Sequence, residues 1–217
     1  MRLEDIVGGL DTWATRRMKE PVGRAFVHLH LTATQLNFIG LAGCVAAGAL
    51  ASAGYFVASG LMFFASSAID FFDGTVARQR GTAPTFSLGA WLDAYLGSVG
   101  EAALYVGVAA IISDANLLRL LGLALLTTLL TSHAKAVAGE YGIQPDWREA
   151  GGVGRGLRIL IASAGLVLAG VAEPVAGTIA IATMTTLIGF NLVVLAYRVR
   201  KIAAAARAKD RRVRCEN

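Results

Sequence analysis

The sequence predicts an all-α, polytopic membrane protein with six transmembrane helices and an N-terminal amphipathic helix on the membrane surface. Of its 217 residues, 55% are hydrophobic and 16% are charged, and the mean hydropathy is +0.59. A soluble domain of this length is usually closer to a quarter charged. The apolar residues are concentrated in long runs almost without charge, as expected of helices of about 20 residues that cross a bilayer.

Turn residues between the apolar runs place the helices in order. Apolar residues at helical spacing over 3–19 predict the surface helix, and Pro21 is expected to end it. Gly54, Asp114 and Pro174 mark three of the turns between spans. The expected spans are about 33–53, 55–79, 86–112, 117–140, 153–171 and 174–209.

Basic residues predict the orientation in the membrane. Lys and Arg collect before the first span, after the second and fourth spans, and from Arg198 to Arg214, whereas the opposite connections contain only Arg119. Such residues accumulate in cytoplasmic loops, so both termini are expected on the cytoplasmic side of the cell membrane. Anionic lipid headgroups account for the basic tail, so no nucleic-acid partner is expected. We divide the chain into a juxtamembrane segment (1–24), a six-helix membrane domain (25–209) and a basic tail (210–217).

Four acidic residues lie within the second and third predicted spans, where charges are costly and are functional candidates by default. Asp70 and Asp73 lie in the second span, and Asp93 and Glu101 in the third. Aspartates that face one another across two helices form an oxygen-ligand site, which suits magnesium, manganese or calcium rather than zinc. An interfacial position explains a single aspartate equally well, but helix packing explains none of the acids.

Small residues and one arginine accompany these acids. The glycines allow either a bulky ligand or a neighbouring helix to approach the backbone closely. Arg78 is placed to hold phosphate oxygens. At about 100° per residue, one stripe consists of Asp70, Asp73, Gly74 and Ala77 with Arg78 at its edge, and the other of Gly89, Asp93, Gly97 and Gly100.

This block resembles the signature of the CDP-alcohol phosphotransferase family. That signature reads D-x-x-D-G-x-x-A-R, then about eight residues, then G-x-x-x-D-x-x-x-D. The chain has Asp70-Phe-Phe-Asp73-Gly74-Thr-Val-Ala77-Arg78, followed by Gly89-Ala-Trp-Leu-Asp93. The expected six-span layout and the polar start of the first span, Thr32 to Gly40, also resemble the family.

The resemblance implies a reaction, a cofactor and a set of site residues. A CDP-linked lipid, either CDP-diacylglycerol or CDP-archaeol, would donate a phosphatidyl-type group to an alcohol, and CMP would leave. Asp70, Asp73 and Asp93 would bind Mg²⁺ or Mn²⁺ on the cytoplasmic side. The resemblance also implies a homodimer. The residues expected to contact the CDP group are Thr34, Asn37, Asp70, Asp73, Gly74, Ala77, Arg78 and Gly89.

Two features depart from the family pattern. Ten residues rather than about eight separate Arg78 from Gly89, which lengthens a loop. The family's fourth aspartate, which the resemblance makes the general base, falls at Gly97. Glu101 lies one turn further, about 6 Å along the axis and about 40° away in direction, and is the candidate substitute. Either the chain is an inactivated member, or another group takes the proton.

A second basic set suggests the acceptor. Lys135 ends the fourth span with His133 nearby, and Arg155 and Arg158 begin the fifth on one face. Positive-inside topology explains these residues equally well. As an anion pocket they would bind a phosphorylated polyol, and their arrangement resembles family members that use inositol phosphate. Glycerol 3-phosphate is the nearest competitor, and serine or ethanolamine fits less well.

Two other classes of function compete with transfer. A catalytically dead member would bind CDP-lipid without releasing CMP, as the glycine at position 97 suggests. A small cation transporter would also carry acids inside its spans. The position of all three aspartates near the cytoplasmic side disfavours transport.

Overall fold

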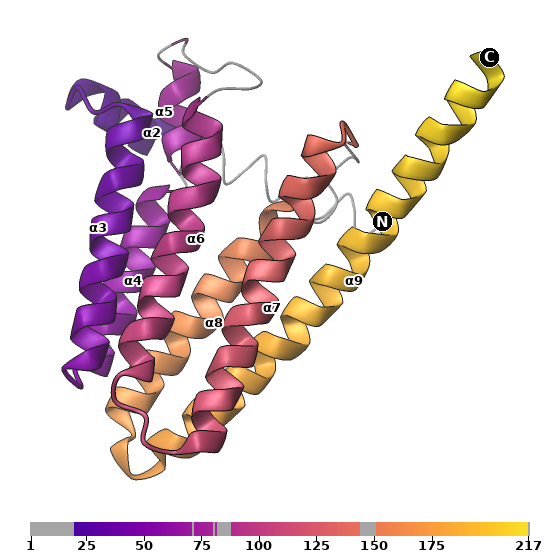
Figure 1. Ribbon diagram of the computed structural model, residues 1–217. Coiled ribbons are helices and arrows are strands. Elements are labelled where there is room, and N and C mark those ends of the chain that lie inside the picture. The colour runs from indigo at the N-terminus through magenta and orange to yellow at the C-terminus, as the bar shows by residue number, and fades with distance from the viewer. Residues whose placement is uncertain (1–19, 71, 80, 82–87, 144–150, 217) are drawn as a thin grey trace, which may run out of the picture.

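The computed structural model describes residues 20–70, 72–79, 81, 88–143 and 151–216, and Figure 1 shows their arrangement. Side chains are described for this part except at 70, 73, 78, 88–91, 151–153 and 212–216. Regular structure throughout this part is helical. The elements are α2 (Glu20–His28), α3 (Ala33–Ser52), α4 (Phe56–Asp70), α5 (Asp73–Gln79), α6 (Leu88–Ala109), α7 (Ala115–Glu140), α8 (Gly151–Val171), the 3₁₀ turn η2 (Glu173–Val175) and α9 (Ala176–Glu216).

Capping side chains explain where two of the long helices begin. Thr32 Oγ1 accepts a hydrogen bond from the Gln35 amide (3.2 Å), and Gln35 Oε1 accepts one from the Thr32 amide (2.9 Å), which forms a capping box before α3. Asp114 Oδ1 accepts a hydrogen bond from the Leu117 amide at 2.7 Å. The predicted helix start after Asp114 is therefore confirmed, with Asp114 as the N-cap of α7.

The structure differs from the prediction in one span and in one additional helix. The span expected over 55–79 is divided into α4 and α5, with Phe72 in a turn between them. Asp and Gly are weak helix formers and Asp favours a helix N-terminus, so a second helix begins at Asp73 and Gly74. A short helix that we did not predict, α2, begins at Glu20, and Pro21 lies in its first turn, where the missing N–H of proline is tolerated. The surface helix expected over 3–19 lies outside the described residues.

Five helices of the described chain are long and apolar enough to cross a membrane, judged by length and composition. They correspond to α3, the α4–α5 pair, α7, α8 and α9. The predicted third span forms α6, which has 22 residues but is not among these five. Asp93 and Glu101 lower its hydropathy, so the count of six spans remains a prediction.

The helices form two groups that join along α4 and α8 (Figure 1). α3 packs against α4 and α6, and α9 packs against α7 and α8. A β-carbon on Gly107 of α6 would lie within 2.6 Å of three backbone atoms of Gly48 on α3, so only glycine allows this close crossing. The starts of α6 and α8, the end of α7 and the middle of α9 lie towards one end of the bundle, which also contains α2 and α5.

Candidate functional site

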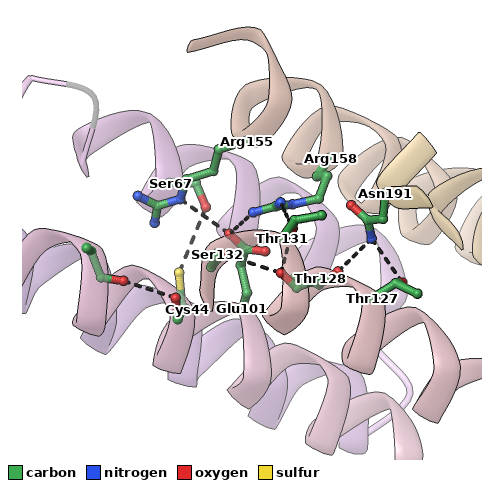
Figure 2. A network of polar contacts seen from close by, with 12 residues as sticks. Cys44, Ser67, Glu101, Thr127, Thr128, Thr131, Ser132, Arg155, Arg158 and Asn191 are labelled. Carbon is green, nitrogen blue, oxygen red and sulfur yellow. Dashed lines mark hydrogen bonds and ion pairs between the residues drawn. The ribbon is translucent and has the colours of Figure 1, made fainter. Parts of the chain in front are cut away.

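Two arginines of α8 meet two carboxylates of α6. Glu101 is 5% exposed, and its Oε1 lies 3.3 Å from both Arg155 Nε and Arg158 Nη2. Arg155 Nη1 lies 3.7 Å from Asp93 Oδ1, so this guanidinium bridges the two acids. Figure 2 shows Glu101 between the two arginine side chains. The buried carboxylate thus holds α6 and α8 together by charge.

Helices α7 and α9 complete the cluster through Thr131. Arg158 Nη1 donates to the Thr131 hydroxyl at 2.8 Å, and Arg198 Nη1 donates to the Thr131 carbonyl oxygen. Arg158 and Arg198 are 4% and 7% exposed, so both cations are held inside the protein. Lys135, one turn beyond Thr131, interacts electrostatically with Asp93 and Arg198. Three helices, α7, α8 and α9, therefore direct cations to one place, which suits a phosphate group.

A polar ladder continues below this cluster towards the middle of the bundle. Asn191 Nδ2 donates to the hydroxyls of Thr128 (2.9 Å) and Thr127 (3.3 Å), as Figure 2 shows. The Tyr105 hydroxyl lies 3.5 Å from the Thr128 hydroxyl. These contacts tie α7 to α9 and α6 below the point where Arg198 of α9 reaches Thr131 of α7.

Gly97 lies midway between Asp93 and Glu101 on α6, under the guanidinium of Arg155. A β-carbon built on Gly97 would come within 2.8 Å of three guanidinium atoms. The space that a side chain at 97 would need is therefore filled by Arg155. Glu101, the candidate substitute base, has Oε1 already bonded to two arginines.

The residues expected at the donor site belong to α3, α5, α6 and the end of α4. Asp70 ends α4, Asp73, Gly74 and Ala77 belong to α5, and Gly89 lies in the first turn of α6. The side chains of Asp70, Asp73 and Arg78 are outside the described residues. α3 packs against both α5 and α6, with Thr34 exposed and Asn37 1% exposed in its first turns.

The expected metal ligands are only partly described. Asp93 is the one of the three whose side chain the structure describes, and it is 37% exposed. Among the described residues, no group of three or more His, Cys, Asp or Glu side chains is close enough to hold a metal ion. The three-aspartate site therefore remains a prediction.

Of the four residues expected to bind the phosphate of the acceptor, three lie together in the structure and one does not. Lys135, Arg155 and Arg158 gather around Asp93 and Glu101, as described above. His133 is exposed and lies two residues before Lys135, about 200° around α7, so the structure does not bring it to the cluster.

Arg198 belongs to the cluster although we did not select it from the sequence. From the sequence it belongs to the basic stretch that predicts topology. A usable signal was its spacing from Asn191, seven residues earlier and on the same face of α9. Two polar residues on one face of a span indicate an inward-facing stripe.

No protein-family model and no curated protein matches the chain. Solved structures of phosphatidylinositol phosphate synthase from Mycobacterium tuberculosis do share its fold. The apo form has a TM-score of 0.70 at 24% identity, covering 84% of this chain and 94% of that chain. The complex with manganese and citrate has 0.71 at 23% identity, covering 85% and 88%. The form with CDP-DAG bound has 0.71 at 23% identity, covering 86% and 94%.

Proposed function

We propose that this protein is a metal-dependent membrane transferase of the CDP-alcohol phosphotransferase family. It moves a phosphatidyl-type group from a CDP-linked lipid to a phosphorylated polyol, and CMP leaves. The observation that carries the proposal is the cation cluster of α7, α8 and α9 beside Asp93, which belongs to the signature block. The shared fold supports it, because the M. tuberculosis enzyme with this fold has been solved with CDP-DAG bound.

The proposed cofactor is Mg²⁺ or Mn²⁺, bound by Asp70, Asp73 and Asp93. Three carboxylates supply the hard oxygen ligands that such ions prefer, and Asp93 is exposed enough to reach a ligand. When bound, the ion neutralises charge on the donor pyrophosphate and on the departing CMP. The residues proposed to border the CDP group are Thr34, Asn37, Gly74, Ala77, Arg78 and Gly89.

The acceptor is proposed to be a phosphate monoester, with inositol phosphate favoured over glycerol 3-phosphate. Around Asp93 and Glu101 the described chain gathers three arginines and Lys135, so positive charge exceeds negative charge there. Guanidinium groups bind phosphate oxygens in pairs, which fixes the direction of the acceptor. An unphosphorylated alcohol would bring no negative charge to this net positive site.

Gly97 cannot take the proton of the acceptor hydroxyl, and Glu101 Oε1 is held by two arginines. We propose that the acceptor's own phosphate accepts the proton. The hydroxyl oxygen then bonds to the lipid-linked phosphorus as the bond from that phosphorus to CMP breaks. The electron pair leaves with CMP, and the proton remains on the product's phosphate monoester.

A second candidate is a protein that binds CDP-lipid without transferring its group. The observation that favours it is the guanidinium of Arg155 lying over Gly97, where the family pattern has a carboxylate. The two candidates share one donor site and differ in turnover.

CMP release from CDP-diacylglycerol separates the candidates. The purified protein in detergent micelles with Mg²⁺ is offered inositol phosphate, glycerol 3-phosphate or inositol, alongside the Gly97→Asp variant. We expect release with a phosphorylated acceptor only, and a gain of about 10²–10⁴-fold in kcat for the variant at saturating acceptor. Release only in the variant would support the binding protein. No release in either protein, with no binding of CDP-diacylglycerol, would refute both.

Membrane insertion with both termini in the cytoplasm and assembly as a homodimer are further parts of the proposal. Charge distribution supports the orientation, and the family resemblance supports the dimer. Protease accessibility of terminal tags in sealed vesicles and light scattering in detergent test them.

A further inference from the structure

Asp93, Gly97 and Glu101 lie along one face of α6 and together contact the side chain of Arg155. These residues are four apart on α6, so they lie above one another over about 12 Å of the helix axis. The guanidinium of Arg155 bridges the two acids, with Nη1 3.7 Å from Asp93 Oδ1 and Nε 3.3 Å from Glu101 Oε1. Its guanidinium lies over the middle residue, Gly97.

Gly97 differs from the packing glycines of the same helix. A β-carbon on Gly107 would meet backbone atoms of α3, and one on Gly100 would meet the Cys44 side chain at 3.0 Å. The three atoms nearest to a β-carbon on Gly97 all belong to the guanidinium of Arg155. A side-chain end can swing away where a helix backbone cannot. Gly97 therefore makes room for a guanidinium and not for a helix.

Glu101 holds Arg155 from a protected position. It is 5% exposed, whereas the Arg155 side chain is 31% exposed and can be reached by a ligand. Arg158, 4% exposed and bonded to Thr131, fixes the same carboxylate oxygen from the other side. Because Glu101 is fixed in this way, it holds the partly exposed guanidinium of Arg155 in one position.

We infer that Gly97 and Glu101 are positioning residues for Arg155, which they hold in place to bind a phosphate group. Gly97 leaves the space for the guanidinium, and Glu101 sets its direction. The phosphate belongs to the acceptor or to the donor pyrophosphate, both of which have to reach this end of the bundle. The inference rests on the proposed function for the origin of that phosphate. In this inference the glycine at position 97 has a function of its own and is more than a missing general base.

Calorimetry in detergent micelles tests the inference without turnover. The ligands are inorganic phosphate, inositol phosphate and CDP-diacylglycerol, and the variants are Gly97→Ala, Glu101→Gln and Arg155→Ala. The control is Gly139→Ala on α7, where a β-carbon meets nothing within 4 Å. Removing one charge-assisted hydrogen bond is expected to weaken phosphate binding about tenfold or more. We expect that loss in all three variants and not in the control.

The pattern of the losses identifies the phosphate. Weaker binding of inositol phosphate and inorganic phosphate alone assigns Arg155 to the acceptor, and weaker binding of CDP-diacylglycerol alone assigns it to the donor. Gly97→Ala and Glu101→Gln that bind every ligand as the control does would overturn the inference. So would a wild-type protein that binds none of them. Binding with these losses but no CMP release would refute the proposed transfer and leave the inference standing.

The KM for each substrate gives a second readout in the active protein. Gly97→Ala should raise the KM for one phosphate-bearing substrate about tenfold and leave the thermal midpoint at that of the control. A parallel fall in thermal midpoint and kcat, with KM unchanged, would indicate a purely structural role and count against the inference.

Discussion

The two ends of the bundle use the same helices in opposite ways. At one end, α6, α7, α8 and α9 bring together charged side chains that are held by ion pairs and hydrogen bonds. At the other end they surround an apolar cavity of about 320 Å³, lined by residues such as Leu104, Leu121, Ala180 and Met184. Charged groups away from water need matched partners, whereas apolar groups tolerate a loose fit. Sensitivity to substitution should therefore fall from the charged end to the cavity end.

Arg158→Leu should have the largest effect. It removes one of two cations from buried Glu101 and the donor to the Thr131 hydroxyl. Breaking one side of a buried ion pair lowers the free energy of unfolding by about 3–5 kcal/mol. Unfolding by SDS in mixed micelles measures the change.

The double variant Arg158→Leu/Glu101→Leu is the control for this prediction. Removing both charges should be less harmful than removing Arg158 alone, because no unmatched carboxylate remains. A double variant less stable than the single one would contradict the comparison.

Asn191→Leu, in the middle of the bundle, should have a smaller effect. It removes two hydrogen bonds, but the Thr127 hydroxyl also donates to the carbonyl oxygens of Leu123 and Ala124, each at 3.0 Å. Hydrogen bonds between membrane helices contribute about 0.6 kcal/mol on average. A double-mutant cycle with Thr128→Val measures the coupling. A coupling energy as large as the loss of stability in Arg158→Leu would contradict the expected decrease in sensitivity from the charged end to the middle of the bundle.

Ala180→Leu, in the cavity wall, should have the smallest effect. The added carbons enter open apolar space, so the free energy of unfolding should change by about 0.5 kcal/mol or less. The matched control is Ala47→Leu in the fully buried core, where overpacking lowers stability by about 1–3 kcal/mol. Equal losses at the two alanines would show that the cavity end is as tightly constrained as the core.

The sequence predicted most helices because apolar runs and caps are local signals. The start of α3 at Ala33 and the Asp114 cap of α7 follow from adjacent residues. The break between α4 and α5 was missed because hydrophobicity continues through Phe72. α2 was missed because we considered Pro21 only as the end of the preceding helix, although proline is also common in the first turn of a helix.

The candidate site was predictable where its residues are close in sequence. The signature block from Asp70 to Asp93 was recognised as one pattern, although the structure leaves its metal ligands untested. The cation cluster joins α7, α8 and α9, so its membership depends on helix crossings that no local pattern encodes. Arg198 was missed for this reason, and the contact of Arg155 with Gly97 could not be foreseen.

The contact between Arg155 and Gly97 also constrains how this protein can evolve. Every residue except glycine at 97 brings a β-carbon into the space of the guanidinium, so the arginine has to move or be replaced with it. The two positions are therefore epistatic, and the effect of a substitution at one depends on the residue at the other. A carboxylate regained at 97 would displace the guanidinium of Arg155 from its place over α6, so the effect of that change depends on how the arginine can move.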